Sequence, residues 1–499
     1  MLALALICAP ISAPCLQEPE ADKRPGFLSF EEGDPDRKRG LQGGLEGAEP
    51  GYVFIAPLNG TATHLVDRSG TVRHTWEHES SPASGSYLLD DGTLIRCGRA
   101  DKDVHFRGGG IGGILQKVAP DGTLLWSWRL ADENTHHHHD IEPLPNGNIL
   151  LIAWERISQA DAGLHGRAKH HVGKAGLWTD KVMEIRPVLP DRAEVVWEWR
   201  SWNHVVQDAY EGRKAFAYPS DHPGRIDINA EHRDAPPLDA AQRAAVKARE
   251  EGMAALGYVG GEDPDDEHLE KLDRDGDWMH TNSIDYHPGL DLILLSSPEL
   301  NEIFLIDHST TTAEAATSKG GRWGRGGELL WRWGNPRNYG AGTDSDRRLW
   351  YQHDPSFLDG PPDELRILVF NNGSGRSGDS FSSVLELVLP WTPEQGFTRH
   401  PDAAWGPVEP AWEYSDPGRF YSAFISGAER LAGGNTLICS GAAGRAFEVD
   451  AAGKLVWDYY NPLGGDVDPP DHAGNAPPLA LFRAEHVAPD HPGLKALGL

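Results

Sequence analysis

Positive charge is scarce in this sequence of 499 residues. It contains 46 Lys and Arg against 75 Asp and Glu, which gives a formal net charge of -29. Nucleic-acid binding requires clustered basic side chains that displace counterions, so this balance argues against a nucleic-acid partner. Apolar runs are short as well, and none after the N-terminus reaches the ~18 residues that a membrane-spanning helix needs.

Cysteine is rare, with four in the whole chain. Cys8 and Cys15 lie in the N-terminal stretch, and Cys97 and Cys439 could pair in an oxidising compartment, although sequence does not set their distance. No CxxC or Cys/His spacing typical of zinc is present. A GxSxG elbow is also absent, and "GGGIGG" at 108–113 lacks the Lys of a phosphate-binding loop. We therefore expect no cofactor.

The first 15 residues, "MLALALICAPISAPC", form a short apolar run followed by small residues. This pattern is similar to an export signal, although no Lys or Arg precedes the run. Cys15 leaves a lipoprotein leader as an alternative, and a disordered apolar tail as another. We expect a periplasmic or extracellular protein, with a lipid anchor left open, and a flexible segment over 16–50 because that stretch is rich in Glu, Asp, Gly and Pro.

From Gly51 onward a unit of short strands, Gly/Asn/Asp turns and terminal tryptophans returns along the chain. Examples are "GGILQKVAPDGTLLWSWRL", "KVMEIRPVLPDRAEVVWEWRSW" and "AFEVDAAGKLVWDYYNP". A repeat of roughly 40 to 80 residues of this kind is typical of a β-propeller, and the Trp-ended units number about six. We predict an all-β fold, a six-bladed β-propeller over 51–462, in which the tryptophans fill the wedges between blades.

Two regions depart from the repeat. Residues 203–277 contain "PPLDAAQRAAVKAREEGMAALGYVG", whose composition and apolar spacing predict a short helix, followed by the acidic "GGEDPDDEHLEKLDRDGD". We interpret 203–277 as an insertion between blades, of the kind that usually crowns one face. Residues 463–499 are interpreted as a C-terminal extension.

Histidine precedes a strand at three corresponding places, in "HHHHDIEPLPNGNILL", "DWMHTNSIDYHPGLDLILL" and "LWYQHDPSFLDGPPDELRILVF". The innermost strands of a propeller point one end at the axis, so we predict a ring of His139, His280 and His353 there. A lone His is more simply a core or loop residue, and recurrence in three blades argues against that interpretation. A metal site stays open, although Asp140 and Asp354 would point to the opposite strand face.

The four consecutive histidines at 136–139 cannot all face the axis if the strand alternates regularly. We expect His139 to face it, with His137 on the same side as the second candidate. His136 and His138 should then be replaceable.

The motifs "HTNSIDY", "QHD" and "VFNNGSGR", with "SGAERLAGGNTLICSGAAGRAFEVDAAGKLVWDYYNP", resemble the bacterial arylsulfate sulfotransferase family from about Gly51 to Pro462. The resemblance implies a six-bladed propeller that moves a sulfuryl group from an aryl sulfate to a phenolic acceptor without a nucleotide. It implies that His353 is the nucleophile, forming a sulfohistidine, and that His280 and Asn282 line the sulfate oxygens. His139 would be the remaining channel histidine.

One departure from the family concerns positive charge. The family places an Arg at the end of the strand after "HTN", where this chain has Pro298. Arg376 of "NNGSGR" and Arg445 of "AAGR" lie at blade positions that could substitute, and Arg107 is a weaker candidate. The simpler explanation of each is a surface or blade-edge ion pair.

Two other functions stay open at this point. One is a binding or scaffold propeller that keeps the histidine ring without turnover, and the other is a propeller similar to the quinone-cofactor dehydrogenases. The expected partners are small molecules, an aryl sulfate donor and a phenolic acceptor. A homodimer is left open.

Overall fold

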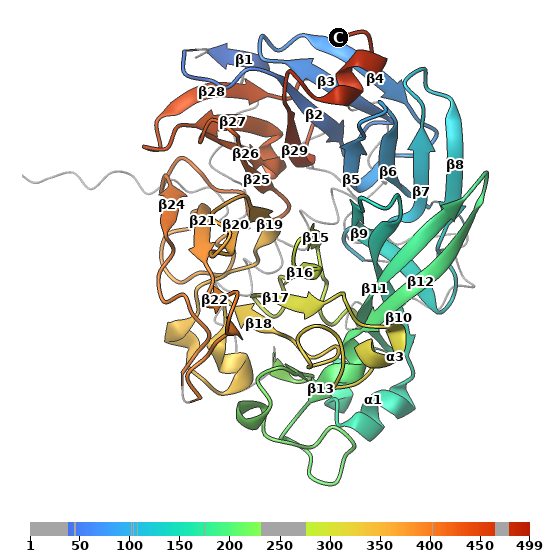
Figure 1. Ribbon diagram of the computed structural model, residues 1–499, viewed down its shortest axis with the longest axis vertical. Helices are drawn as coiled ribbons and strands as arrows, with labels where there is room; N and C mark the ends of the chain where they lie inside the picture. The colour runs from blue at the N-terminus through green and yellow to red at the C-terminus, as the bar shows by residue number, and fades with distance from the viewer. Residues whose placement is uncertain are drawn as a thin grey trace, which may run out of the picture.

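Six antiparallel sheets surround a central axis in the computed structural model of the protein (Figure 1). The structure describes residues 38–43, 46–100, 102, 104–106, 108–173, 175–230, 276–401, 403–464 and 479–499. Each sheet has four or five strands and forms one blade. The predicted all-β, six-bladed propeller is therefore confirmed.

The blades follow one another along the chain. In the second to fifth blades the innermost strand comes first, whereas the first and sixth blades each combine strands from two distant parts of the sequence. The first blade contains β29 (Leu481–Val487), β2 (Tyr52–Pro57), β3 (Ala62–Asp67) and β4 (Val72–Glu77). The second contains β5 (Pro82–Leu88), β6 (Leu94–Arg99), β7 (Gly113–Val118) and β8 (Leu124–Arg129). The third contains β9 (Thr135–Pro143), β10 (Ile149–Ile157), β11 (Leu177–Val188) and β12 (Arg192–Arg200).

The second half of the ring repeats this arrangement. The fourth blade contains β15 (Ser283–His287), β16 (Leu292–Ser297), β17 (Glu302–Asp307) and β18 (Trp331–Trp333). The fifth contains β19 (His353–Leu358), β20 (Arg366–Asn371), β21 (Ser383–Val388) and β24 (Trp412–Ser415). The sixth contains β25 (Gly427–Arg430), β26 (Thr436–Ser440), β27 (Arg445–Val449), β28 (Leu455–Tyr460) and β1 (Gly40–Gly43).

Both ends of the described chain close the ring. Strand β29 pairs with β2 and becomes the innermost strand of the first blade, while β1 pairs with β28 at the outer edge of the sixth. The propeller therefore includes strands on both sides of the predicted limits of 51 and 462. Residues 481–487 had been assigned to an extension and 40–43 to a flexible segment, and both assignments are wrong because each stretch completes an unfinished sheet edge.

The hydrophobic core is divided into wedges between neighbouring blades. The middle strands β16 and β17 are buried along their whole length, whereas the outer strand β12 is largely exposed. A middle strand has a blade against each face, which explains continuous apolar runs such as "LILL". The wedge between the fourth and fifth blades, for example, joins Leu294 and Leu305 to Ile367 and Leu387.

Tryptophans on the outer strands join each blade to the next. The indole of Trp199 donates to Gly327 O at 2.8 Å, from the third blade to the fourth. Trp457 in the sixth blade donates to Arg68 O of the first at 2.9 Å. Equivalent bonds are made by Trp126, Trp197, Trp331, Trp333 and Trp412. The predicted wedge-filling role of these residues is confirmed, and a tryptophan hydrogen bond is added at every seam except that between the first and second blades, where the buried indole nitrogen of Trp76 has no hydrogen-bond partner among the described residues.

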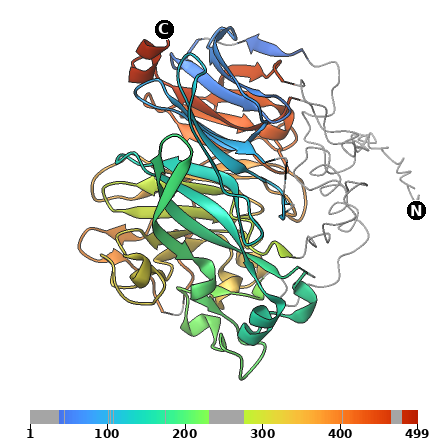
Figure 2. The ribbon, with the colours of Figure 1, turned by 90° about the vertical axis from the view of Figure 1, so that its right-hand side faces the viewer.

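The remaining elements lie outside the blades. They are the helices α1 (Gln159–His165), α3 (Thr312–Ala315) and α4 (Pro492–Ala496), and the short strand pairs β13 (Val205–Val206) with β14 (Ile226–Asp227) and β22 (Trp391–Thr392) with β23 (Gly396–Phe397). Figure 2 shows α4 beside the strands of the first blade, where Leu494 packs on Trp76 and Phe54. The predicted leader 1–15 and the helix expected in 236–260 lie outside the described residues.

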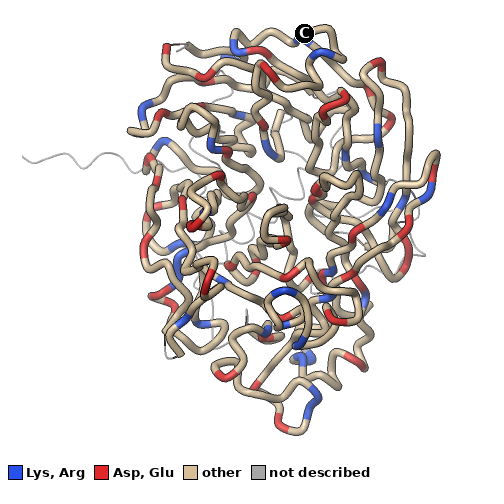
Figure 3. The backbone as a smooth tube through the Cα atoms, viewed as in Figure 1, with Lys and Arg blue, Asp and Glu red and all other residues tan. Residues whose placement is uncertain are grey.

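Charged residues are distributed around the whole ring. Figure 3 shows acidic and basic positions interspersed over the blades. None of the helices in the described part of the chain has the length and apolarity needed to cross a membrane.

Candidate active site

The innermost strands bring the three predicted histidines together near the axis. His139 lies on β9, His280 lies three residues before β15, and His353 begins β19. The His139 and His280 rings are edge to face with centroids 4.6 Å apart. The ring of Phe482, on β29, lies 6.3 Å from His139 and 6.4 Å from His353 by centroids. Four strands from different blades thus converge on one cluster.

The backbone at this cluster is not that of a regular strand. His139 has φ 51° and His280 has φ 52°, in the left-handed region that residues other than Gly rarely adopt. The pairing of β9 with β10 also shifts register between Leu151 and Ala153. Left-handed residues of this kind cluster at functional sites, where the surroundings hold them in place.

This break overturns the expected alternation among the four consecutive histidines. All four are fully buried. His137 does not face the axis: its Nδ1 accepts the Gly113 N–H at 3.2 Å, and its Nε2 lies 3.6 Å from Cys97 Sγ. The second candidate for the axis was therefore wrong, because His137 is held against the second blade.

His138, expected to be replaceable, belongs to the cluster. Its ring stacks on Trp154 with centroids 4.2 Å apart and planes inclined by 7°. Its Nδ1 lies 2.8 Å from Nδ1 of His139, and its Nε2 lies 3.4 Å from Oδ1 of Asp180. The other oxygen of Asp180 accepts the Thr281 N–H at 2.7 Å. Asp180 and His138 therefore connect His139 to the segment that carries His280.

The glycines of "GGGIGG" allow the chain to approach these rings closely. A Cβ added to Gly110 would stand 2.2 Å from the His139 ring, and one added to Gly112 would stand 2.3 Å from the His137 ring. Gly110 O also accepts the His139 N–H at 2.6 Å. The loop over 108–113 is thus a covering for the histidines, and glycine is required because the rings occupy the space of a side chain.

His280 is paired with a carboxylate. Its Nδ1 lies 2.5 Å from Asp277 Oδ2, and Asp277 Oδ1 accepts the Trp154 indole N–H at 3.1 Å. Burial by itself would lower the pKa of His280, but the negative charge and the hydrogen bond of Asp277 outweigh burial and raise the pKa. His280 is therefore the histidine of the cluster that favours the charged form.

His353 is oriented by an amide. Its Nδ1 lies 2.8 Å from Asn372 Oδ1 and 3.1 Å from Tyr351 O. The Asn372 amide nitrogen donates to two backbone carbonyls, those of Ser422 and Ile425, each at 2.8 Å, which fixes the amide oxygen toward His353. Since both partners of Nδ1 are acceptors, we infer that Nδ1 carries the proton and that Nε2 keeps its lone pair.

The remaining ring charges follow from burial. Burial lowers the pKa of His353 to about 4, and the nearby His280 adds to this lowering. Burial likewise lowers the pKa of His139 well below its usual value, again with a contribution from His280. Burial thus disfavours the charged form of His139 and His353, whereas Asp277 favours it on His280.

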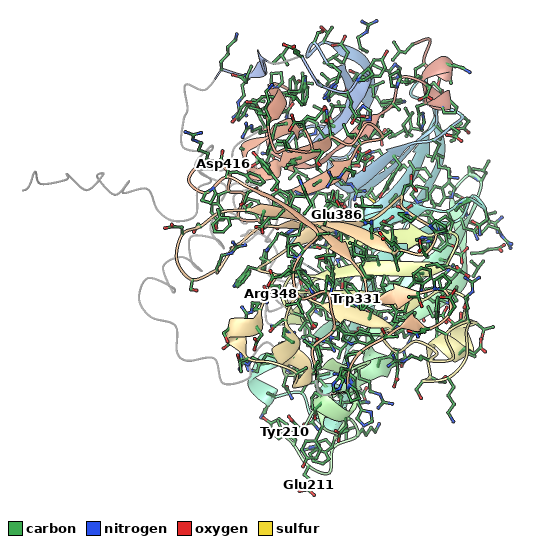
Figure 4. All side chains as sticks on the ribbon, turned by 60° about the vertical axis from the view of Figure 1, so that its left-hand side comes forward. Tyr210, Glu211, Trp331, Arg348, Glu386 and Asp416 are labelled. Atoms are coloured by element: carbon green, nitrogen blue, oxygen red, sulfur yellow. The ribbon has the colours of Figure 1, made fainter. Side chains whose placement is uncertain are left out.

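Of the two predicted substrate-binding residues, Asn282 lies beside the segment that carries His353 and Arg376 lies elsewhere. Asn282 is buried, and its amide nitrogen donates to Gln352 O at 2.8 Å, so one of its two amide hydrogens holds the residue before His353. Arg376 packs over Phe381 and Trp350, with its guanidinium carbon 4.0 and 4.8 Å from the ring centroids. It lines a separate cavity of about 180 Å³ beside Arg348, which Figure 4 labels.

The other candidates for a substitute cation do not join the cluster either. Arg445 forms an ion pair with Asp458 at 2.7 Å on the sixth blade, as the simpler explanation predicted. Arg107 lies outside the described residues. Pro298 is buried directly after β16. The described residues that lead from it to β17, 298–301, contain no arginine.

A second group of ionisable residues lies on the far side of the histidine-bearing strands. Arg483 of β29 contacts Asp140 at 2.9 Å and Asp354 at 3.2 Å, the residues that directly follow His139 and His353. Asp140 and Asp354 thus point away from the histidines, as expected. A cavity of about 140 Å³ here is lined by further carboxylates, among them Glu142, Asp285, Glu429 and Glu485.

Several of these residues were missed by the sequence analysis. Asn372 enters the sequence analysis only as a letter of the motif "VFNNGSGR", and Asp277 only as the end of the acidic stretch. Phe482 and Arg483 belonged to the assumed extension, although "LFRAEHV" is itself compatible with a strand. The spacing of Asp277 three residues before His280 was the one local signal available.

Neither cysteine of the propeller forms a disulfide: Cys97 and Cys439 are both buried and free. Across the described ranges, no group of three or more His, Cys, Asp and Glu side chains has an arrangement that could hold a metal ion.

Comparison with known families decides the assignment. The sequence model of the Arylsulfotransferase (ASST) family matches residues 58–461. The chain belongs to the arylsulfotransferase family. The match includes all three axial histidines and the motifs around them, and the family implies a sulfotransferase enzyme acting on small molecules. Among curated proteins, none matches this arylsulfotransferase.

Solved structures resemble the arylsulfotransferase only distantly. A protein of unknown function from Bacteroides caccae is 10% identical, with a TM-score of 0.39, over 87% of this chain and 98% of that one. The periplasmic gluconolactonase of Pseudomonas aeruginosa is 10% identical, with a TM-score of 0.36, over 82% and 96%. An inactive virginiamycin B lyase from Staphylococcus aureus is 9% identical, with a TM-score of 0.31, over 85% and 89%.

Proposed function

We propose that this arylsulfotransferase moves a sulfuryl group from an aryl sulfate to a phenolic acceptor through a sulfohistidine at His353, without a nucleotide. The observation that carries the proposal is the bond between Nδ1 of His353 and Asn372 Oδ1, 2.8 Å long. It supports a neutral ring whose Nε2 lone pair is available as nucleophile.

The first step would form an N–S bond between Nε2 of His353 and the sulfuryl sulfur. The S–O bond to the aryl group breaks, and its electron pair leaves on the phenolate. In the second step an acceptor phenol attacks the same sulfur, the N–S bond breaks, and its electron pair returns to Nε2. The ring of His139 is unprotonated before the acceptor phenol binds, because burial lowers its pKa well below the usual value, and it is our candidate for the group that takes the phenolic proton.

The sulfuryl oxygens need donors during both steps. His280, whose pKa is raised by Asp277 against the effect of burial, would supply a charged N–H. The second hydrogen of the Asn282 amide is a further candidate donor, since the first is held by Gln352 O.

The test is to incubate the purified protein with a chromogenic aryl sulfate and a phenol in the absence of nucleotide. We expect phenolate release and sulfation of the acceptor, and complete loss of both in His353→Ala. His165→Ala, on the remote helix α1, serves as the control and should keep full activity. Mass spectrometry should find one added sulfuryl group on the peptide that contains His353.

A second function is favoured by Pro298, which stands where the family has an Arg. A propeller without turnover would bind sulfate near the histidines and release no phenolate. Absence of release above a heat-denatured control, across several aryl sulfates, would decide for this binding function.

We also propose that the protein is exported, on the basis of the apolar segment at 1–15. Fractionation of cells that express the full chain should recover it outside the cytoplasm. Recovery in the cytoplasmic fraction with an intact N-terminus would contradict export.

A further inference from the structure

We propose that Asp277 is a positioning residue of the histidine cluster. It holds Nδ1–H of His280 and makes this ring the cation that binds an anionic sulfuryl oxygen, in place of the arginine that Pro298 replaces. This inference rests on the proposed function and adds to it Asp277, the residue that favours the positive charge on His280. Along the sequence, the strands of blade four (β15–β18) lie between Asp277 and the proposed nucleophile His353.

Asp277 is fixed on several sides. One carboxylate oxygen lies 2.5 Å from Nδ1 of His280 and the other accepts the Trp154 indole N–H at 3.1 Å. Its backbone forms a bridge with Trp178 of β11, and the next residue, Trp278, donates to Trp178 O at 3.2 Å. The side chain is only 11% exposed. A carboxylate held in this way cannot turn away from His280 without breaking contacts to the third blade.

The groups that face His280 favour a positive charge on it. Asp277 is nearest, and Asp180 of β11 and Glu299 after β16 act in the same direction and raise the pKa of His280. The opposing groups are His139 of β9 and His353 of β19, and burial keeps both of these neutral. Two neutral rings do not compete with the cation for an anion.

The bond to Asp277 also settles which nitrogen of His280 remains for a ligand. Nδ1 is used by Asp277 Oδ2, so Nε2 of the protonated ring carries the second N–H. A charged N–H is a stronger donor to an oxyanion than a neutral one, and its value rises in a site that excludes water. Asp277 touches neither substrate nor nucleophile and acts only through His280.

The experiment measures binding of inorganic sulfate to the full-length protein by isothermal titration calorimetry between pH 6 and 9, which needs no turnover. In Asp277→Asn the hydrogen bond can remain while the charge is lost. We expect binding at pH 7 to weaken by about tenfold, and the pH at which sulfate affinity is lost to fall by about one unit, because deprotonation of His280 becomes easier.

The matched control is Asp291→Asn on the same blade. Asp291 Oδ1 lies 2.7 Å from Nδ1 of His308, a carboxylate–histidine pair of the same kind that involves the turn after β15, whereas Asp277 and His280 precede this strand. Its loss should leave sulfate binding unchanged. His280→Gln should weaken binding as much as Asp277→Asn, and the double variant should be no weaker than either single variant, since the two residues form one unit.

Equal sulfate affinity in Asp277→Asn and the unmodified protein would overturn the proposal, as would failure of the unmodified protein to bind sulfate. Additive losses in the double variant would overturn it too, because they would mean that Asp277 acts independently of His280. These outcomes are separate from the proposed function. If sulfate binding depends on Asp277 but no sulfuryl transfer occurs, this inference is retained and the transferase reaction is rejected. If transfer occurs and is unaffected in Asp277→Asn, the transferase reaction is retained and this inference is rejected.

Discussion

At the scale of single residues, the histidine cluster depends on two glycines, Gly110 and Gly112, because they have no side chain. The rings of His139 and His137 occupy the volume next to Gly110 and Gly112, where a Cβ would stand 2.2 and 2.3 Å away. Protein interiors are close-packed, so a methyl group at either glycine must displace a histidine ring. The glycine loop therefore restricts the positions of His139 and His137 by contact, whereas Asp277 and Asn372 orient His280 and His353 by hydrogen bonds.

Gly110→Ala tests this arrangement against Gly122→Ala. Both glycines have a positive φ, 68° and 85°, but a Cβ at Gly122 meets nothing within 4 Å. Gly122→Ala should lower the free energy of unfolding by about 1 kcal/mol through backbone strain alone. Gly110→Ala should lower it by about 3 kcal/mol or more and also impair the site, because overpacking adds to the strain. Urea unfolding and sulfate binding measure the two effects, and equal losses in both variants would refute the packing argument.

The sequence could identify residues that recur at corresponding positions of the repeat, but not residues whose orientation depends on the local backbone conformation. His139, His280 and His353 were found because each lies at or beside the inner strand of a blade in a motif that recurs. His137 and His138 were assigned wrongly because the left-handed backbone of His139, with φ 51°, breaks the alternation on which the assignment depended.

At the scale of elements, β29 connects the two sides of the axis. Phe482 lies against the rings of His139 and His353, and its neighbour Arg483 pairs with Asp140 and Asp354. One strand therefore links the residues on both faces of β9 and β19. No local pattern could have shown this, because β29 pairs with Tyr52–Pro57 at the opposite end of the sequence. The Trp-ended blades, in contrast, were predictable because each is a local repeat.

Arg483→Met should strongly destabilise the protein. The Arg483 side chain is 9% exposed and Asp140 is fully buried, so removal of the guanidinium leaves carboxylates inside without a counter-charge. We expect a loss of about 3–5 kcal/mol in the free energy of unfolding. Arg186→Met is the control, since Arg186 and Glu194 form an ion pair that is 59% and 55% exposed, and its loss should cost less than about 1 kcal/mol. Similar losses in the two variants, measured by urea unfolding, would show that Arg483 contributes no more than a surface residue.

At the scale of the whole molecule, buried ionisable groups of two kinds make stability depend on pH in opposite ways. Burial raises the pKa of Asp285 to about 7, of Glu485 to about 7 and of Glu429 to about 8. Burial lowers the pKa of His204 and of His353 to about 4. The carboxyls with a raised pKa bind protons more readily in the folded state than in the unfolded state, so they lower the free energy of unfolding as the pH rises. The buried histidines with a lowered pKa bind protons less readily in the folded state, so they lower the free energy of unfolding as the pH falls below about 6.5.

Above pH 6.5 the histidines with a lowered pKa are largely neutral in both states. The carboxyls still act, and so do His280 and His308, whose pKa values are raised by carboxylate partners against the effect of burial, so that their stabilising contribution is also lost as the pH rises. The melting temperature should therefore fall as the pH rises from about 6.5 to about 9. Glu429→Gln, which stays neutral and can still accept the His486 N–H that lies 2.7 Å from Glu429 Oε2, should melt higher than the unmodified protein at pH 9 and equally at pH 6. Glu409→Gln, with a side chain that is 72% exposed, is the control and should show no such difference. A melting temperature that is flat or rising over this interval would contradict the assignment.

The pairing of β29 with β2 gives the molecule an order of assembly during synthesis. Phe482 and Arg483 leave the ribosome after all three axial histidines. Until then the first blade lacks its inner strand, and the carboxylates beside His139 and His353 lack their cation. A chain that ends before β29 can thus build most of the ring but not the complete histidine cluster, so synthesis of β29 is the step that completes it.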